Sequence, residues 1–358
     1  MIHVFIGTKA QYIKTAPVLR EMDRRGTPYR LVDSGQHGEF ARHLRGSLGV
    51  REPDEFVGGS RDITTISAAA RWSVSLSLLG LSGKRLRDRV FDGDGDGVCV
   101  VHGDTPTTLI SAMLAKRAGL GVAHLESGLR SRSLLHPFPE ELIRLAVMRT
   151  ADLLFAPDDT AVGNLGAMSI RGAVVPTHGN TSVEALVYAL GGETVDSTGP
   201  VIMTTHRVEN LKSRTTMIRF VSLLESVAAD HPTVFVMHRP TEAAIGHLGL
   251  MERVERSGAD VLQLVDHGEF VRMIAHAPFV VSDGGSIQEE CALLGVPTLV
   301  WRKATERPDG IGQNVVLADF DDSTIADFLG SHETLRRQPR ALDATPSREI
   351  VDVLEGWS

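Results

Sequence analysis

Residues 98–126, VCVVHGDTPTTLISAMLAKRAGLGVAHLE, contain two short apolar runs on either side of a longer segment with helical character. The runs at 98–103 and 121–126 are unbroken, as in strands that helices cover on both faces of a parallel sheet. Asp104 follows the first run, and Glu126 ends the second. The stretch therefore predicts a strand–helix–strand unit whose polar residues lie at the carboxyl edge of a sheet, where ligands bind in open α/β folds.

The same alternation continues outward in both directions and predicts two α/β domains. Apolar runs typical of strands lie at 2–7, 29–35, 98–103, 121–126, 153–157, 201–206, 233–238, 261–265, 279–285 and 297–301. The segment GGETVDSTGP (191–200) is rich in turn-forming residues and is the predicted linker. We expect a Rossmann-like N-terminal domain over 1–190 and a Rossmann-like C-terminal domain over 200–345. A terminal helix over 346–358 is expected to pack back on the first domain, and the two doubly wound sheets to face a central cleft.

Composition narrows the classes of function. The chain has 358 residues, 42% of them hydrophobic and 23% charged, with a net charge of −8. An acidic protein lacks the basic surface that nucleic acid requires, although a local pocket of cations can still bind a small phosphorylated ligand. The first apolar run has no basic flank, and none approaches the roughly 20 residues that span a bilayer. We expect a cytoplasmic enzyme without a nucleic-acid or membrane partner, whose two cysteines are buried and reduced.

Cationic and glycine-rich segments at strand ends in the second half suggest an anion site. FVVSDGGSIQEE (279–290) places two glycines before a helix, where backbone N–H groups attract anions. TTHRVEN (204–210) offers His206 and Arg207, and arginine binds diphosphates through charge-assisted hydrogen bonds. WRKATERPDGIG (301–312) adds a charged loop after another strand. Each segment alone also fits a structural role: an ordinary turn, a structural histidine or a solvated loop.

Carboxylates at strand and helix ends in the first half suggest acid–base chemistry. Asp104 lies in VHGDTPTT (101–108), Glu126 in HLESGLRS (124–131), and Glu140 in HPFPEELIR (136–144) after Pro139. Helix capping by Thr105 would explain the first motif equally well. The acidic run FDGDGDG (91–97) has Gly103 where a calcium loop needs its bidentate glutamate. The sequence also lacks the GxxxxGK[ST], GxGxxG and HExxH motifs.

Taken in order, these motifs resemble the bacterial UDP-N-acetylglucosamine 2-epimerases, which have a glycosyltransferase-B-like fold. The resemblance covers nearly the whole chain and lies in nine motifs: GTKAQYIKTAPVL, GQHGEF, VHGDTPTT, HLESGLRS, PFPEELIR, HGNTSVEAL, TTHRVEN, SDGGSIQEE and TERPDG. It implies that UDP is eliminated across C1–C2 of the sugar, giving 2-acetamidoglucal, and then re-added with C2 protonated from the opposite face. That reaction needs neither a dinucleotide nor a metal.

The resemblance also assigns roles to single residues. It implies catalytic roles for Asp104, Glu126, Glu140 and His206. It implies substrate binding by Lys9, Lys14, Arg207, His238, Phe270, Gly284, Gly285, Ser286, Glu290 and Arg307. Among these, Glu290 would hold the ribose hydroxyls and Phe270 would lie near the uracil. The expected partners are a UDP-sugar and a second copy of the chain in a homodimer.

Three departures from the family pattern leave alternatives open. The family's GTRPE reads GTKAQ here, so Lys9 replaces a bidentate guanidinium and Gln11 a carboxylate. The family's Asp-Ser-Gly-Gly reads Asp283-Gly284-Gly285-Ser286. In GQHGEF, Gly38 replaces an arginine of the activator site near Gln36 and His37, which predicts weak activation by UDP-GlcNAc. The main hypothesis is a non-hydrolysing epimerase; a hydrolysing epimerase that releases ManNAc and UDP, a glycosyltransferase of the same fold and a non-catalytic sensor of UDP-sugars are the alternatives.

Overall fold

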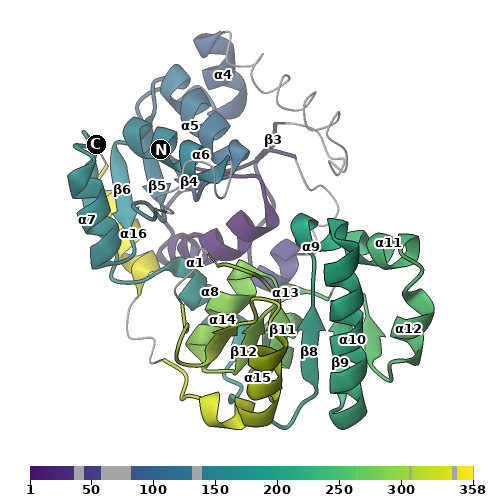
Figure 1. Ribbon diagram of the computed structural model, residues 1–358. Helices are drawn as coiled ribbons and strands as arrows, with labels where there is room; N and C mark the ends of the chain where they lie inside the picture. Colours follow the sequence, from purple (N-terminus) through teal and green to yellow (C-terminus); the bar gives the residue numbers. More distant parts are fainter. Residues whose placement is uncertain are drawn as a thin grey trace. The chain divides into compact units, whose positions relative to one another are not determined.

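The structure is a computed structural model that describes residues 1–35, 44–57, 82–130, 139–263, 265–305, 309–340 and 345–357. The chain divides into two compact units: unit 1 comprises Met1–Ala185 and Leu342–Ser358, and unit 2 comprises Leu186–Ala341. Each unit is a parallel β-sheet between helices (Figure 1). The predicted fold class of two Rossmann-like α/β domains is confirmed.

Unit 1 contains a seven-stranded sheet in the order β3-β2-β1-β4-β5-β6-β7. Its strands are β1 (Ile2–Ile6), β2 (Tyr29–Asp33), β3 (Glu55–Phe56), β4 (Val98–His102), β5 (Gly121–Leu125), β6 (Leu153–Ala156) and β7 (Ala173–Pro176). Its described helices are α1 (Lys9–Arg25), α4 (Gly83–Val90), α5 (Pro106–Ala118), α6 (Glu140–Thr150), α7 (Asp159–Ala167), α8 (Thr181–Leu190, which crosses into unit 2) and α16 (Pro346–Glu355). Two apolar clusters pack on the sheet, and its central strands β1 and β4 are buried along their whole length.

Capping residues explain why the unit 1 helices begin where the strands end. Thr8 caps α1 in a reciprocal capping box with Gln11, so the chain turns into a helix two residues after β1. Thr105 caps α5, as predicted, and Pro106 takes the first helical position, where its missing N–H costs nothing. Both caps lie at the carboxyl edge of the sheet, which places the ends of α1 and α5 beside the candidate site.

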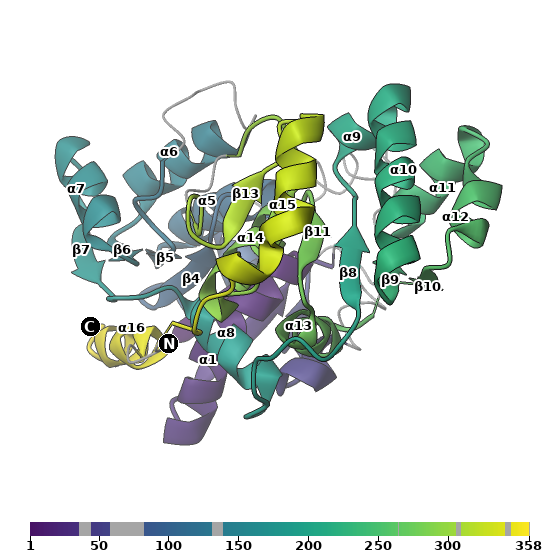
Figure 2. The same ribbon diagram turned by 60° about the horizontal axis from the view of Figure 1, so that its bottom comes forward.

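The last helix, α16, packs against α1 although more than 300 residues separate them in sequence (Figure 2). Arg25 of α1 binds the Asp352 carboxylate at 2.5 Å. At the start of α16, the Ser347 N–H and hydroxyl donate to the Glu184 carboxylate of α8. The C-terminal segment thus completes unit 1.

Unit 2 contains a six-stranded sheet in the order β10-β9-β8-β11-β12-β13. Its strands are β8 (Val201–Thr204), β9 (Thr233–Val236), β10 (Asp260–Leu262), β11 (Val280–Ser282), β12 (Thr298–Val300) and β13 (Val315–Leu317). Its helices are α9 (Val208–Lys212), α10 (Arg214–Asp230), α11 (Arg239–His247), α12 (Met251–Arg256), α13 (His267–His276), α14 (Gly285–Leu294) and α15 (Asp322–Leu335). The segment expected to be a linker belongs to unit 2, because Gly199 N–H donates to the His276 carbonyl and Asp196 N–H to that of Ala275.

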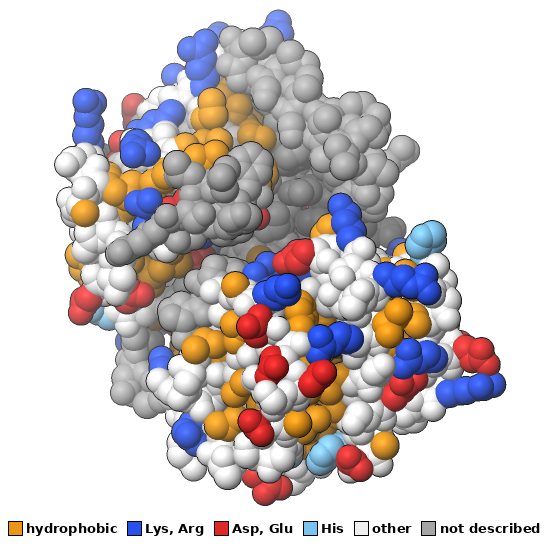
Figure 3. Space-filling view, viewed as in Figure 1, with side chains coloured by type: hydrophobic (Ala, Val, Ile, Leu, Met, Phe, Trp, Pro, Cys, Tyr) orange, Lys and Arg blue, Asp and Glu red, His pale blue; other side chains and the backbone are white. Residues whose placement is uncertain are grey.

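Charged side chains of both signs are interspersed on the face of unit 2 seen in Figure 3. Ion pairs on the surface of this unit join Arg219 to Asp322 and Arg253 to Glu225. None of the helices that the structure describes has both the length and the apolar character needed to cross a membrane.

Candidate active site

The carboxyl ends of β1, β4 and β5 lie side by side, because β4 pairs in parallel with both other strands. The segments that follow these strands therefore meet at one edge of the unit 1 sheet. They carry Lys9 at the start of α1, Asp104 after β4 and Glu126 after β5. Lys9 and Asp104 are both half-buried.

Glu126 is held by donors from two different segments. Its Oε1 accepts hydrogen bonds from Lys14 Nζ of α1 at 2.5 Å and from Asn180 Nδ2 at 2.7 Å. Its backbone has a φ of 61°, in the left-handed region that L-residues adopt only at an energetic cost. Strain of this kind persists where the surrounding structure imposes it, and it concentrates at functional sites. The structure thus brings the predicted residues Lys14 and Glu126 together.

Asp104 belongs to a chain of alternating charges. Its carboxylate pairs with Arg144 of α6, and Arg144 Nη1 also donates to Glu141 Oε2 at 3.0 Å. Glu141 is fully buried and accepts a second cationic donor, Arg130 Nε, at 2.5 Å. A buried carboxylate between two guanidinium groups is compensated, so this network fixes Arg144 beside Asp104.

Glu140 is the first residue of α6, as its position after Pro139 predicted. Its side chain is half-buried, and Oε2 is buried without a hydrogen-bond partner within the described part of the chain. No hydrogen bond or ion pair joins it to Asp104 or Glu126 among the described residues. A buried carboxylate oxygen without a partner is costly, so this atom is available to a proton or a ligand.

Two histidines below the edge are buried and neutral. His102 ends β4 and His124 lies in β5. Burial, which disfavours the charged imidazolium, lowers the pKa of His102 to about 3 and that of His124 to about 4. His124 is held by the Gly103 carbonyl at 2.8 Å and the Ser127 hydroxyl at 2.6 Å. Near neutral pH both rings add no charge to the site.

Gln11 ties β1 to β4. Its Oε1 accepts from the N–H groups of Gly7 and Thr8, and its Nε2 donates to the His102 carbonyl at 2.8 Å and to the hydroxyls of Thr105 and Thr108. A carboxylate at this position could not donate to the His102 carbonyl. The departure from the family's glutamate therefore has a structural consequence here: the amide holds the turn that carries Asp104.

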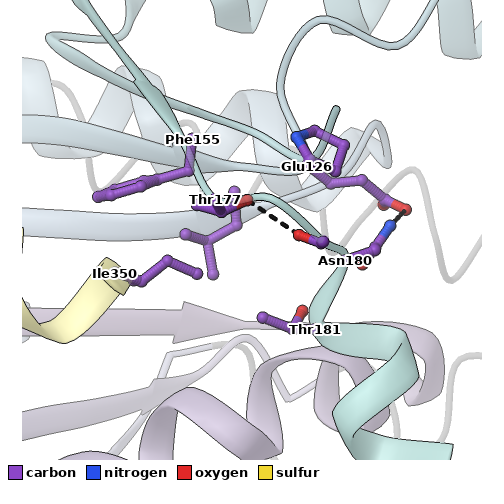
Figure 4. A pocket seen from close by; sticks show the side chains of 9 residues that line it. Glu126, Phe155, Thr177, Asn180, Thr181 and Ile350 are labelled. Atoms are coloured by element: carbon purple, nitrogen blue, oxygen red, sulfur yellow. Dashed lines mark hydrogen bonds between the residues drawn. The ribbon is translucent and has the colours of Figure 1, made fainter. Parts of the chain in front are cut away.

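A small pocket lies beside Glu126, and Figure 4 shows its lining side chains. The Asn180 amide points at the Glu126 carboxylate, while Thr177 donates to the Gly179 carbonyl at 2.9 Å. Phe155 and Ile350 form its apolar side, Ile350 coming from α16. The C-terminal helix thus contributes to the surroundings of the strained glutamate.

The second candidate region lies at the carboxyl ends of β8 and β11 in unit 2 and is organised by Asp283. This fully buried carboxylate accepts from the Thr205 hydroxyl at 2.7 Å, from the backbone N–H of His206 and Arg207 at 3.0 Å, and from Asn210 Nδ2 at 2.9 Å. Arg207 Nε donates in turn to the Asp283 carbonyl at 3.0 Å. The carboxylate therefore determines the course of the turn that presents His206 and Arg207.

His206 lies between an acid and a second ring. Its Nδ1 is 3.2 Å from Asp283 Oδ1, and its ring stacks on that of His238 with 5.0 Å between centroids. A Cβ added to Gly284 would come within 2.9 Å of His206 Cε1, so a side chain at position 284 would displace the imidazole. The structure thus brings together three predicted residues, namely His206, His238 and Gly284.

The remaining predicted residues of unit 2 lie on α13 and α14. Helix α14 begins at Gly285, one residue earlier than expected, and Ser286 is exposed in its first turn. Glu290 Oε1 lies 3.9 Å from His267 Nε2, and Phe270 of α13 packs on an apolar cluster of unit 2. These positions are compatible with the roles that the resemblance implies, and nothing in the structure tests those roles.

Other predictions are not tested by the structure. Arg307 and the activator segment with Gln36, His37 and Gly38 lie outside the described residues. The three catalytic candidates Asp104, Glu126 and Glu140 belong to unit 1 and His206 to unit 2, so their meeting in one cleft stays a prediction. Within the described ranges, no group of three or more His, Cys, Asp and Glu residues is placed to hold a metal ion.

Sequence reasoning missed several residues that shape these regions: Gln11, His102, Arg130, Glu141, Arg144, Asn180 and Asp283. Arg144 and Glu141 lie three residues apart in PFPEELIR, a helical spacing that places them on one face and could have revealed the pair. The contacts of Gln11, Asn180 and Asp283 join segments 54 to 97 residues apart, and no local pattern indicates such contacts.

Comparison with known proteins agrees with this architecture. Residues 20–347 match the family model described as UDP-N-acetylglucosamine 2-epimerase. The UDP-N-acetylglucosamine 2-epimerase of Bacillus subtilis is 30% identical over 373 aligned residues, covering 97% of this chain and 93% of the relative. A structure of the Neisseria meningitidis UDP-GlcNAc 2-epimerase bound to UDP-GlcNAc has a TM-score of 0.80 at 23% identity, with 99% of both chains covered. The family model and the Bacillus relative each cover most of the chain, and the chain belongs to the UDP-N-acetylglucosamine 2-epimerase family.

Proposed function

We propose that the chain is a non-hydrolysing UDP-N-acetylglucosamine 2-epimerase that interconverts UDP-GlcNAc and UDP-ManNAc. The observation that carries the proposal is the strained Glu126 carboxylate, held by Lys14 and Asn180 at the same sheet edge as Asp104. Family membership supplies the substrate class, because the relatives carry that name and a structure of one holds UDP-GlcNAc. A cytoplasmic location and a homodimer belong to the same proposal.

The proposed reaction is an elimination followed by an addition. A carboxylate takes the C2 proton, the C1–oxygen bond breaks, and the bonding electrons leave with UDP, which yields 2-acetamidoglucal. In the second step a UDP oxygen attacks C1, and an acid returns a proton to C2 on the opposite face. The sequence is redox-neutral, since the electron pair that leaves with UDP returns with it.

The site's chemistry supports this division of labour. Acid and base must lie on opposite sides of the sugar ring, and Asp104, Glu126 and Glu140 come from three separate segments of unit 1. Each has a different environment: Arg144 beside Asp104, Lys14 and Asn180 on Glu126, and, on Glu140, an oxygen with no hydrogen-bond partner among the described residues. Carboxylates from separate segments with different neighbours suit the separate roles of acid and base. His206 and Arg207 would bind the diphosphate in unit 2.

The fold alone does not determine which reaction the protein catalyses. A UDP-glucosyltransferase from Polygonum tinctorium shares the fold with a TM-score of 0.58 at 13% identity. A glycosyltransferase would need an acceptor for turnover, whereas an epimerase needs none. A hydrolysing epimerase would let water capture C1 and release free ManNAc.

One experiment separates these outcomes. The purified protein is incubated with UDP-GlcNAc in D₂O without acceptor, and products are followed by proton and phosphorus NMR. We expect UDP-ManNAc to accumulate to an equilibrium mixture, with deuterium at C2 of both sugars. Free ManNAc and UDP as the only products would replace the proposal with the hydrolysing enzyme. Turnover only after an acceptor is added would replace it with a transferase.

A further inference from the structure

The His102 side chain lies next to the Glu126 carboxylate and has no role in the proposed reaction. It is the last residue of β4, and its side chain is 3% exposed. Its Nδ1 is 3.0 Å from the Thr15 hydroxyl of α1, and its Nε2 is 3.7 Å from Glu126 Oε2. Nε2 is buried and has no hydrogen-bond partner among the described residues. A buried polar atom of this kind, aimed at a strained functional carboxylate, needs an explanation.

The position of the single ring proton follows from the neighbours of the two nitrogens. A neutral imidazole carries one N–H, on either Nδ1 or Nε2. If Nδ1 carried it, the lone pair of Nε2 would face a carboxylate oxygen at 3.7 Å, and two acceptors would repel each other. If the Thr15 hydroxyl donates to Nδ1, Nε2 carries the proton and presents it to Glu126. Electrostatics therefore favours the second tautomer.

We propose that His102, with its tautomer set by the Thr15 hydroxyl, is a positioning residue for Glu126. The inference rests on the proposed function, in which Glu126 belongs to the acid–base set. The distance of 3.7 Å exceeds a hydrogen bond by about 0.7 Å, so the bond forms if the Glu126 side chain rotates slightly toward Nε2. Glu126 then receives donors from three directions: Lys14, Asn180 and His102.

This third donor affects both the orientation and the charge of the carboxylate. Hydrogen bonds to an ionised carboxylate favour its charged form. Among the described residues, the charged or titratable groups at this edge include Lys14 from α1, His102 from β4, His124 from β5 and, farther away, Arg144 from α6 with its partner Asp104. Of these groups, His102 offers the simplest test, because its hydrogen-bond partner Thr15 is neutral and does not itself contact Glu126.

Thr15→Val tests the relay, because it removes the hydroxyl and nearly preserves the volume. We expect kcat to fall about tenfold, because Glu126 loses the hydrogen bond that His102 donates to its charged carboxylate. KM should be nearly unchanged, because no other hydrogen bond to a charged group is lost. The midpoint of the acidic limb of the kcat/KM profile should move to higher pH, and Thr15→Ser should restore both. Thr150→Val is the matched control, because that hydroxyl caps a helix carbonyl, Ala146 O, away from the site.

A second variant series and a spectroscopic readout guard against a misfolded mutant. His102→Gln keeps an N–H near the position of Nε2 and should retain more activity than His102→Leu. In ¹⁵N-histidine-labelled wild type, the His102 signal, assigned by its absence in His102→Leu, should report a neutral Nε2–H ring from pH 5 to 9. An Nδ1–H ring would overturn the proposal, as would wild-type rates and pH profiles in folded Thr15→Val and His102→Leu. Absence of epimerisation by the wild type, with an Nε2–H ring, would instead contradict the proposed function.

Discussion

The two strand-edge regions solve the problem of a buried charge in opposite ways. In unit 1 the carboxylates are paired with cations: Glu126 with Lys14, Asp104 with Arg144, and Glu141 with Arg130. In unit 2 Asp283 is satisfied by neutral donors, two of them backbone N–H groups. Cationic side chains can reorient by changing rotamer, whereas backbone donors are fixed by the fold. Under the proposed function, we therefore expect the unit 1 edge to carry the proton transfer and the unit 2 edge to present a rigid binding surface.

The largest expected effect is a loss of epimerisation rate when Glu126 in unit 1 is changed. Glu126→Gln keeps the volume and the Asn180 contact but removes one member of the proposed acid–base set, so epimerisation should slow by a factor of about 10² to 10⁴. The melting temperature and the affinity for UDP, which we assign to unit 2, should change little. Calorimetry with UDP and rate measurements by NMR test both points, with Glu255→Gln on the exposed face of α12 as a control. A variant that retains near wild-type rates would remove Glu126 from the mechanism.

For Asp283 in unit 2 we expect the opposite pattern, with losses of stability and of UDP affinity. Asp283→Asn removes the charge and turns an NH₂ group toward donors that now bind the carboxylate, which should cost about 3 kcal/mol of unfolding free energy. UDP affinity should fall about tenfold or more, because the turn with His206 and Arg207 loses its anchor. Denaturant unfolding and calorimetry measure the two losses. Asp321→Asn, at the cap of α15 in the same unit, should be almost neutral, since asparagine caps helices equally well. Equal stability of both variants would contradict the scaffold role.

The dependence of stability on pH should also differ between the two units, although this effect is smaller. The folded pKa values of His102 and His124 are lowered by burial, so their contribution to stability is complete above about pH 6.5 and is lost as the pH falls toward 4. Each of the two histidines lowers the free energy of unfolding by up to about 1.4 kcal/mol per pH unit as the pH falls through that window. In unit 2 the hydrogen bonds that His276 donates to Asp196 and Glu193 raise the pKa of His276, so its contribution to stability is present below pH 6.5 and disappears as the pH rises.

Hydrogen exchange resolved by peptide measures this difference. From pH 7 to pH 5, after correction for intrinsic rates, protection of β4 and β5 should fall more than protection of β11 and α13. His124→Gln can preserve the contact with the Gly103 carbonyl and cannot protonate, so it should flatten the response of unit 1. The same loss of protection in both units would show that the buried histidines do not control the acid response.

The sequence by itself determined most of the strands, the starts of α5 and α6, and the chemical types of the strand-edge residues. Periodicity is a local property, so the runs at 98–102 and 121–125 could be assigned as buried strands, and Thr105 as a cap, from neighbours alone. The short strands β3 and β7 and the strand β13 were missed. β3 has only two residues, and β7, although its sequence AVVP is apolar, has four residues that are exposed or only half-buried.

Only the tertiary structure decided which of those polar residues act on one another. The sequence contains Gln11, Thr15, His102, Glu126 and Asn180, but their pairing depends on which strands lie side by side. Parallel β4 and β5 place His102 opposite Leu125, one residue before Glu126, and the capped start of α1 places Lys14 and Thr15 against the same edge. Burial there changes chemistry as well as contact: a histidine that would titrate near pH 6.5 in water is neutral in the folded protein. Residue types follow from sequence, whereas charge state and partner follow from the environment that distant segments create.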